Sequence, residues 1–141
     1  MADITRTAGD VRPLPGAMIR RFDAGGTLYT GYSVYIAADG DVEASAAADS
    51  LTATSIGIFV ADNTGSTIAT DGDRVDVCVL GPVTGFSSMT PGALAFASSR
   101  AGGLVHAVPS AGSFPCVVGV AESATILFVN PTQAHAYVVK A

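Results

Sequence analysis

The chain has 141 residues, of which 49% are apolar and 13% are charged, and its formal net charge is −5. This length fits one domain or two very small ones, and the apolar content excludes intrinsic disorder. The acidic balance disfavours a nucleic-acid partner, because a negatively charged surface repels phosphate backbones.

Residues 1–17 predict an extended N-terminal arm. Pro13 and Pro15 favour extended backbone, and the four arginines of residues 1–22 outnumber two aspartates, so the arm is mildly basic. An equal alternative is that the first ten residues are disordered and the arginines only solvated. The start lacks the apolar core of a secretory signal, and no apolar run reaches the ~20 residues of a membrane-spanning helix. We therefore expect cytoplasmic synthesis and no membrane partner.

Short runs rich in Val, Ile, Tyr, Phe and Thr, separated by Gly, Pro, Asp and Asn, predict β-strands along the whole chain. These runs are 18–22, 33–37, 42–44, 55–60, 74–80, 93–97, 104–107, 116–121 and 125–129. Residues 37–41 (AADGD) and 71–73 (DGD) predict turns. Residues 44–53 are the single helix candidate, but they lack an apolar stripe at 3.6-residue spacing, so an ordered loop is an equal alternative. The fold class predicted is all-β.

The strand expected at 74–80 alternates valines with Arg74, Asp76 and Cys78, which is typical of a strand with one polar and one apolar face. Gly81, Pro82 and Gly85 then predict a turn, because proline removes a ladder donor and glycine permits unusual backbone angles. This turn would separate two halves of the chain.

Those halves resemble each other. Residues 28–61 align with residues 89–122, so that Gly31 matches Gly92 and Gly57 matches Gly119. We predict two related β units, about 28–80 and 89–129, in a single β domain (18–131) that forms a compact barrel or sandwich and precedes a C-terminal tail (132–141). Gly57 and Gly119 lie inside expected strands, where glycine usually marks a bulge or the close approach of another segment. The alternative is the self-similarity of any glycine-rich β chain.

The sequence offers little catalytic chemistry. His106 and His135 are its two histidines, and no G-x-S-x-G motif is present. Cys78 and Cys116 lie in apolar runs and predict buried side chains, with a disulfide as the alternative. Without paired ligand spacing these four residues do not predict a zinc site. We expect no enzymatic activity and no cofactor.

A calcium site is likewise not predicted. Asp71, Asp73 and Asp76 resemble a calcium loop only superficially, and no glutamate completes the twelve-residue pattern. We expect these aspartates to serve turns and solubility, and we expect no metal.

Four segments in this order resemble the small decoration, or capsid cement, proteins of tailed bacteriophages: Gly31 with Val34 to Ile36, Gly72 to Val77, Gly81 to Gly85, and Val118 to Thr125. The resemblance covers about residues 13–131. It implies a β-rich, often trimeric protein on the outer capsid surface that binds the major capsid protein and reinforces the shell. It also implies a virion localisation after assembly in the host cytoplasm.

On this resemblance the arm becomes the expected capsid contact, through Arg12, Pro13, Pro15, Arg20 and Arg21, whose guanidinium groups pair well with carboxylates. The second hypothesis is a head-fibre or tail-associated protein that binds a host glycan or protein. Its contact surface would be Tyr29, Tyr32 and the loop from Asp62 to Thr67. The tyrosines otherwise fit ordinary strand positions.

Overall fold

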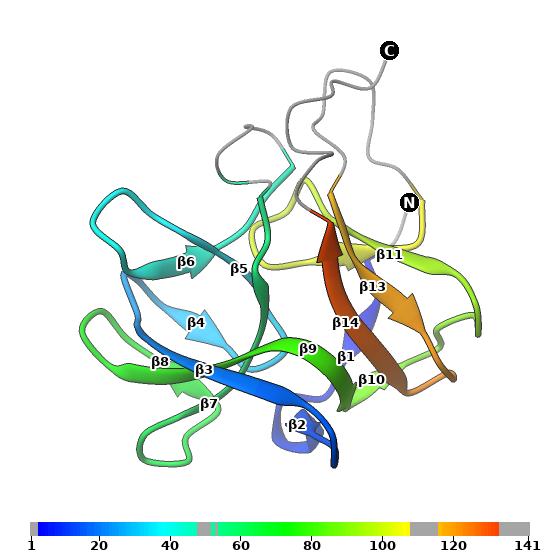
Figure 1. Ribbon diagram of the computed structural model, residues 1–141, viewed down its shortest axis with the longest axis horizontal. Coiled ribbons are helices and arrows are strands. Elements are labelled where there is room, and N and C mark those ends of the chain that lie inside the picture. The colour runs from blue at the N-terminus through cyan, green and yellow to red at the C-terminus, as the bar shows by residue number, and fades with distance from the viewer. Residues whose placement is uncertain (1–2, 48–51, 53, 108–115, 133–141) are drawn as a thin grey trace.

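The computed structural model describes residues 3–47, 52, 54–107 and 116–132, and they form an all-β structure (Figure 1). The first unit and the segment before it contain β1 (Thr5–Arg6), a 3-10 turn (Ala8–Asp10), β2 (Arg12–Pro13), β3 (Met18–Asp23), β4 (Leu28–Tyr29), β5 (Ser33–Ile36), β6 (Val42–Ala44), β7 (Gly57–Asp62), β8 (Ile68–Ala69) and β9 (Arg74–Thr84). The second unit contains β10 (Phe86–Ser87), β11 (Leu94–Ala97), β12 (Leu104–Val105), β13 (Val117–Ala121) and β14 (Ile126–Thr132).

The predicted all-β class is confirmed, and each of the nine predicted strands is present, 42–44 with the predicted ends and the other eight with at least one shifted end. The helix candidate 44–53 begins at the last residue of β6, and its described residues are not helical, whereas residues 48–51 and 53 lie outside the described part. Both predicted turns are confirmed: the amide of Gly40 donates to the carbonyl of Ala37 (2.9 Å), and the amide of Asp73 donates to Thr70 (3.0 Å).

The strand order has the same pattern on both sides of its centre. The main sheet has the order β12-β11-β13-β14-β9-β7-β5-β6, and every strand pair in it is antiparallel. From the central pair outwards, β9 is followed by β7, β5 and β6, while β14 is followed by β13, β11 and β12. The same pairing therefore recurs on both sides, as expected for two related units that meet along β9 and β14.

Matching hydrogen bonds support this equivalence. Gly31 and Gly92 are each the third residue of a four-residue turn closed by a 3.0 Å hydrogen bond, and their φ angles of 94° and 83° are ones that glycine adopts without strain. The amide of Gly31 donates to Phe59 on β7 (2.9 Å), and the amide of Gly92 donates to Ala121 on β13 (2.8 Å). The two glycines thus fix the same turn in both units.

Gly57 and Gly119 also occupy equivalent places. Gly57 on β7 pairs with Val34 on β5, and Gly119 on β13 pairs with Ala95 on β11. A Cβ atom on either glycine would run into a carbonyl oxygen of the next strand, β9 or β14. The predicted close approach of another chain segment is confirmed at both positions.

Buried apolar side chains form two clusters, one on each side of β7 and β9. Phe59 and Val77 belong to a smaller cluster in the first unit. Ile58 and Cys78, their neighbours along the same strands, belong to a larger cluster that contains most of the second unit's core. The expectation of a polar face on strand 74–80 is therefore wrong at Cys78, because this face is covered by the second unit.

The turn predicted at Gly81 and Pro82 is also wrong, because β9 continues to Thr84. Residues 74–80 pair with β3 and β7, whereas residues 81–84 pair with β14 and, at the last two positions, with β2. A Cβ atom on Gly81 would lie 2.7 Å from the Cα atom of Ala17, so glycine here permits a close crossing. Pro82 has no N–H to donate to the ladder, and its carbonyl accepts a hydrogen bond from the Leu14 amide (2.9 Å). One strand thus joins both units.

The N-terminal segment lies against the body. β1 pairs with β10, and β2 pairs with the end of β9. Ile4 and Val11 are buried in the larger cluster, whereas Arg12 and Pro13 are exposed in extended backbone. Residues 3–13 therefore contribute to the core before the chain turns into β3.

Candidate functional site

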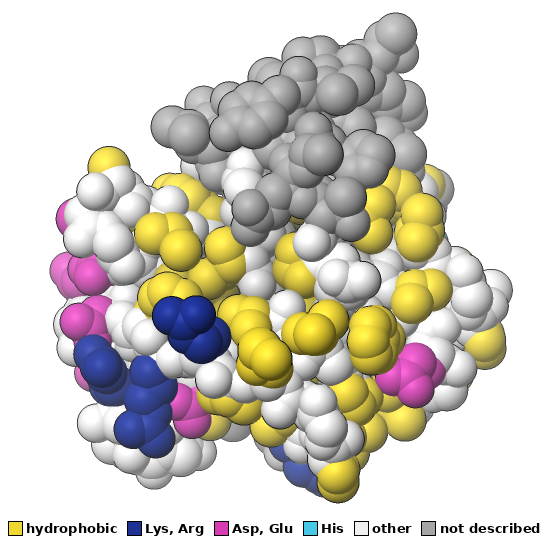
Figure 2. All heavy atoms as spheres, in the orientation of Figure 1, with side chains coloured by type: hydrophobic (Ala, Val, Ile, Leu, Met, Phe, Trp, Pro, Cys, Tyr) yellow, Lys and Arg dark blue, Asp and Glu magenta, His cyan; other side chains and the backbone are white. Residues whose placement is uncertain are grey.

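One face of the sheet carries a contiguous group of apolar side chains that the fold leaves partly in solvent. Figure 2 shows hydrophobic side chains gathered across the centre of the face on which β3 and β9 lie in Figure 1. Six apolar side chains line one groove of the sheet. Met18, Ile36 and Leu80 are 54%, 47% and 39% exposed, and Phe22, Ile56 and Val79 are half-buried. We call these six residues the apolar face.

The apolar face lines an open groove of about 470 Å³, whose other walls are Arg20, Asn130 and Pro131. Phe22, Ile56 and Val79 pack against the smaller core cluster from inside the groove. The groove is thus an open end of the first unit's core, and it borders the second unit at β14. Contiguous apolar surfaces of this kind usually mark contacts with other molecules.

β3 forms an open edge beside this groove. It pairs with β9 alone, so its other edge has no partner strand among the described residues. Met18 lies opposite Leu80 in that pairing, which places the most exposed large apolar side chains of β3 and β9 together. Unpaired strand edges bind extended segments of other chains, and arginines within such an edge discourage pairing with unselected strands.

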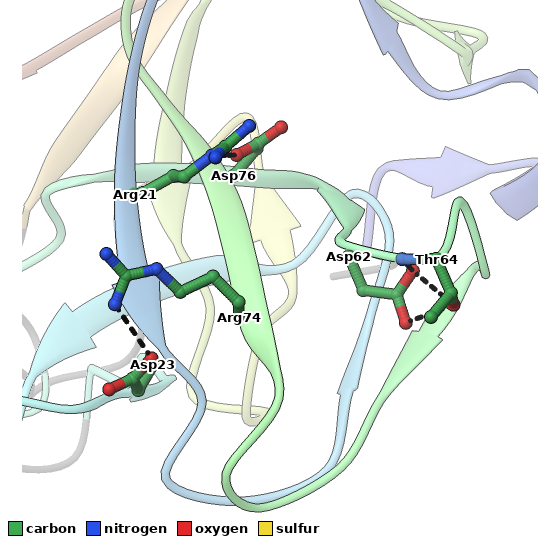
Figure 3. Close-up of polar contacts among 6 residues, drawn as sticks. All are labelled: Arg21, Asp23, Asp62, Thr64, Arg74 and Asp76. Atoms are coloured by element: carbon green, nitrogen blue, oxygen red, sulfur yellow. Dashed lines mark hydrogen bonds and ion pairs between the residues drawn. The ribbon is translucent and has the colours of Figure 1, made fainter.

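Two of the three arginines on β3 and β9 are held in ion pairs across these strands (Figure 3). The Arg21 Nε atom lies 3.0 Å from Asp76 Oδ1, and the Arg74 Nη1 atom lies 3.1 Å from Asp23 Oδ1. Arg20, on the alternate face of β3, has no carboxylate partner within the described ranges, and it is exposed. It is therefore a positive charge available to a partner at the rim of the apolar face.

The five predicted contact residues occupy different surroundings. Arg20 lies at the apolar face, and Arg21 is paired with an aspartate. Pro15 is exposed in the Pro-Gly turn that leads into β3. Arg12 lines a separate concavity of about 360 Å³ and, like Pro13, is exposed on β2. Of the five, the structure thus brings Arg20 together with the exposed apolar side chains. The sequence pattern did not single out those apolar side chains.

Acidic loops lie near the other end of the first unit. The pKa of Asp41 is raised by partial desolvation and, to a smaller degree, by the negative charges of Asp39, Asp23 and Asp71. Within the described part of the chain no group of three or more His, Cys, Asp or Glu side chains forms a metal site. Asp73 instead accepts hydrogen bonds from the Thr70 amide (2.8 Å) and hydroxyl (3.1 Å), which closes a turn.

A second concavity, of about 490 Å³, lies on the N-terminal segment and includes the two tyrosines singled out in the sequence. The rings of Tyr29 and Tyr32 are 5.4 Å apart and tilted by 56°. The Arg6 guanidinium lies over the Tyr32 ring, 4.6 Å from its centre, and its Nε atom donates to the carbonyl of Thr30 (3.2 Å). Sequence reasoning missed Arg6, because no local pattern places β1 beside residues 29–32.

The loop from Asp62 to Thr67, the third part of that predicted surface, is fixed by Asp62. This buried carboxylate accepts hydrogen bonds from the amides of Thr64 (3.0 Å) and Ser66 (2.6 Å) and from the Thr64 hydroxyl (2.9 Å). Figure 3 shows Asp62 and Thr64 facing each other across the loop. The amide of Thr30 donates to Thr67 (3.0 Å), so the loop ends next to the tyrosines.

The remaining candidate chemical groups have structural surroundings. Cys78 and Cys116 are buried in the larger cluster as thiols rather than as a disulfide, which confirms the prediction of buried side chains, and burial raises the pKa of both. The ring of His106 bonds the Thr90 amide (3.1 Å) and the Leu94 carbonyl (2.9 Å). His135 lies outside the described residues.

None of the described segments forms a helix with the length and apolar character needed to cross a bilayer. A scan against protein-family models found no match, and a search of curated proteins found no relative. The surfaces described above are therefore the basis for a functional assignment.

Proposed function

We propose that this protein is a non-enzymatic capsid decoration, or cement, protein that binds the outside of a phage head and stabilises the shell by bridging capsid subunits. The observation that supports this proposal is the apolar face, next to the open edge of β3 and the unpartnered Arg20. A surface with an apolar centre, a charged rim and an open strand edge has the composition of a protein interface.

The physical reason is the cost of leaving this surface in water. Fully burying a large apolar side chain contributes about 1.5–3 kcal/mol, so covering the half-exposed Met18, Ile36 and Leu80 favours association by roughly 2–4 kcal/mol. Arg20 adds specificity, since a guanidinium at the rim selects a partner that presents a carboxylate. A capsid shell offers many equivalent copies of such a partner surface.

β9 connects the apolar face to the second unit. β9 pairs with β3 beneath the apolar face and continues into the pairing with β14 in the second unit. A capsid subunit bound at β3 is thereby linked through backbone hydrogen bonds to both units.

We further propose, on the resemblance, a trimeric state, which light scattering of the purified protein measures.

Localisation and add-back test this proposal. Particles assembled without the protein should lose resistance to heat and regain it when purified protein is added, and cryo-electron microscopy should place the protein on the head. Its location on a fibre or tail would refute the cementing function in favour of the alternative, a head-fibre or tail-associated protein.

A pair of matched variants tests the surface itself. Met18→Ser combined with Leu80→Ser should abolish add-back, while the melting temperature of the isolated protein changes little because both side chains are exposed. Leu94→Ser is the control, since Leu94 is 46% exposed on β11 outside the apolar face. Equal particle binding by the double variant and the control would show that another surface contacts the shell.

A further inference from the structure

The concavity on the N-terminal segment has features that the capsid contact does not use. Its walls include Asp3, Arg6 and Tyr29, and its lining shares no residue with the groove at the apolar face. An open hollow that combines an aromatic ring with a few convergent polar groups is the usual form of a small-ligand site.

Three glycines hold the side chains of this hollow in place. A Cβ atom on Gly31 would run into the Arg6 side chain, one on Gly102 would run into the Tyr32 ring, and one on Gly103 would lie 2.6 Å from Asp3 Oδ2. The side chains therefore rest directly on backbone. Close packing of this kind restricts their rotamers and pre-organises the hollow for a ligand.

Tyr29 is the ring that a ligand can reach. Arg6 covers one part of Tyr32 and Gly102 lies against its ring, so Tyr32 serves to support the hollow. Tyr29 stays 41% exposed and leans against Tyr32 at 56°. The electron-rich face of a tyrosine attracts weakly positive C–H groups such as those on one side of a sugar ring.

The polar groups beside this ring are a donor and an acceptor. Arg6 uses Nε for Thr30, which leaves its two terminal nitrogens without a partner among the described residues. Asp3 accepts a hydrogen bond from Ser98 on Oδ1 (2.9 Å), and its Oδ2 atom has no partner in the same part of the chain. Neighbouring sugar hydroxyls both donate and accept, so one hydroxyl can bond the carboxylate while the next accepts from the guanidinium.

We propose that this hollow is a binding site for a neutral pyranose sugar of a glycan, with Tyr29 as the stacking platform and Arg6 and Asp3 as hydrogen-bonding partners. The single positive and single negative charge cancel, which favours neutral over anionic sugars. The site is independent of the capsid contact, so it would give a decorated particle a carbohydrate-binding surface.

The contacts of Arg6 and Asp3 also hold the N-terminal segment against the body. The test therefore uses Tyr29, which takes no part in these contacts. The wild-type protein should bind neutral glycans on a printed array, and saturation-transfer NMR should detect the methyl glycosides of glucose, galactose, mannose or N-acetylglucosamine. Tyr29→Ala should weaken binding about tenfold, because it removes both the apolar contact area of the ring and the attraction of its face for C–H groups.

Two further variants make the result specific. Tyr29→Phe keeps the ring and should retain binding, and Ile36→Ala removes a similarly exposed side chain from the other groove and should leave binding unchanged. Unchanged melting temperatures show that all three variants fold. Failure of the wild type to bind any neutral glycan, binding of anionic glycans alone, or full binding by Tyr29→Ala would each overturn the proposal. Loss of capsid binding would not affect it.

Discussion

Replacing Gly57 with alanine tests the tightest contact in the sheet. The new Cβ atom would run into the carbonyl oxygen of Cys78 on β9 and would lie 3.1 Å from the Cγ1 atom of Val77. Backbone cannot rotate away as a flexible side chain can, so β7 has to move from β9. These strands form the wall between the two apolar clusters, and both clusters are disturbed by the shift.

The expected loss follows from two costs. A ladder hydrogen bond that is stretched or broken costs about 1 kcal/mol, and forcing alanine into a φ of 154° adds strain of roughly 1–3 kcal/mol. Gly57→Ala should therefore lower the free energy of unfolding by about 2–4 kcal/mol, out of the ~5–15 kcal/mol typical of small proteins. At roughly 3 °C per kcal/mol for a chain of this size, the melting temperature should fall by about 6–12 °C.

Two further variants make the measurement decisive. Gly119→Ala should also destabilise, because its Cβ atom would meet the carbonyl of Phe128 on β14. Its φ is not in the left-handed region, so only the disturbed ladder hydrogen bond counts and the cost should be about 1 kcal/mol. Gly40→Ala is the control, because Gly40 also has a positive φ (89°) but a Cβ atom there would meet open space. It should lower the free energy of unfolding by only about 1–2 kcal/mol. Urea unfolding followed by circular dichroism measures all three. If Gly57→Ala costs no more than Gly40→Ala, or if Gly119→Ala has no measurable cost, the close approach at that glycine is refuted.

Asp62→Ala should cost about 2 kcal/mol in urea unfolding, because it leaves partly buried amides without an acceptor, and a loss below about 0.5 kcal/mol would contradict this role. Burial raises the pKa of Cys78 and Cys116, so the folded state favours the neutral thiols. The contribution of these thiols to stability is therefore complete below about pH 8.5, the pKa of a free thiol, and it falls as the pH rises further. Between about pH 7 and about pH 10, the urea midpoint of the double variant Cys78→Ala, Cys116→Ala should therefore decline less than that of the wild type. An equal decline in both proteins would show that the thiols are not the cause of the pH dependence. Arg21→Ala should lower the free energy of unfolding by less than about 1 kcal/mol, since the ion pair of Arg21 with Asp76 is exposed. In 1 M salt this loss should shrink, and an unchanged loss would show that charge is not its cause.

Strand positions were predictable because the signals are local. Branched and aromatic residues between Gly, Pro and Asp mark the strands, and turns such as AADGD (37–41) depend on the residues within them. The short strands β4 and β8 were missed, because a two-residue strand has no measurable alternation of its own. β4 and β8 exist because their segments pair with each other.

The candidate sites depended much more on contacts distant in sequence. Arg20 was predictable as an exposed cation on a strand, but its place beside Ile36 and Leu80 follows from the pairing of β3 with β9 and the curvature of the sheet. Asp3 and Arg6 reach Tyr29 only because β1 crosses from the second unit towards the first. No spacing rule in the sequence connects these segments.

The sequence by itself determined the all-β class and marked Gly57 and Gly119 as places of close approach, because these follow from composition, local alternation and the absence of a Cβ atom. The duplication stays a prediction, which the mirrored strand pairing supports. Tertiary structure decided that β9 runs unbroken through Gly81 and Pro82, that Cys78 faces a second core, and which exposed side chains meet. The physical reason is that burial and strand pairing depend on the partner segment. An alternating strand can have one or both faces covered, and only the packed chain shows which faces remain open to a partner.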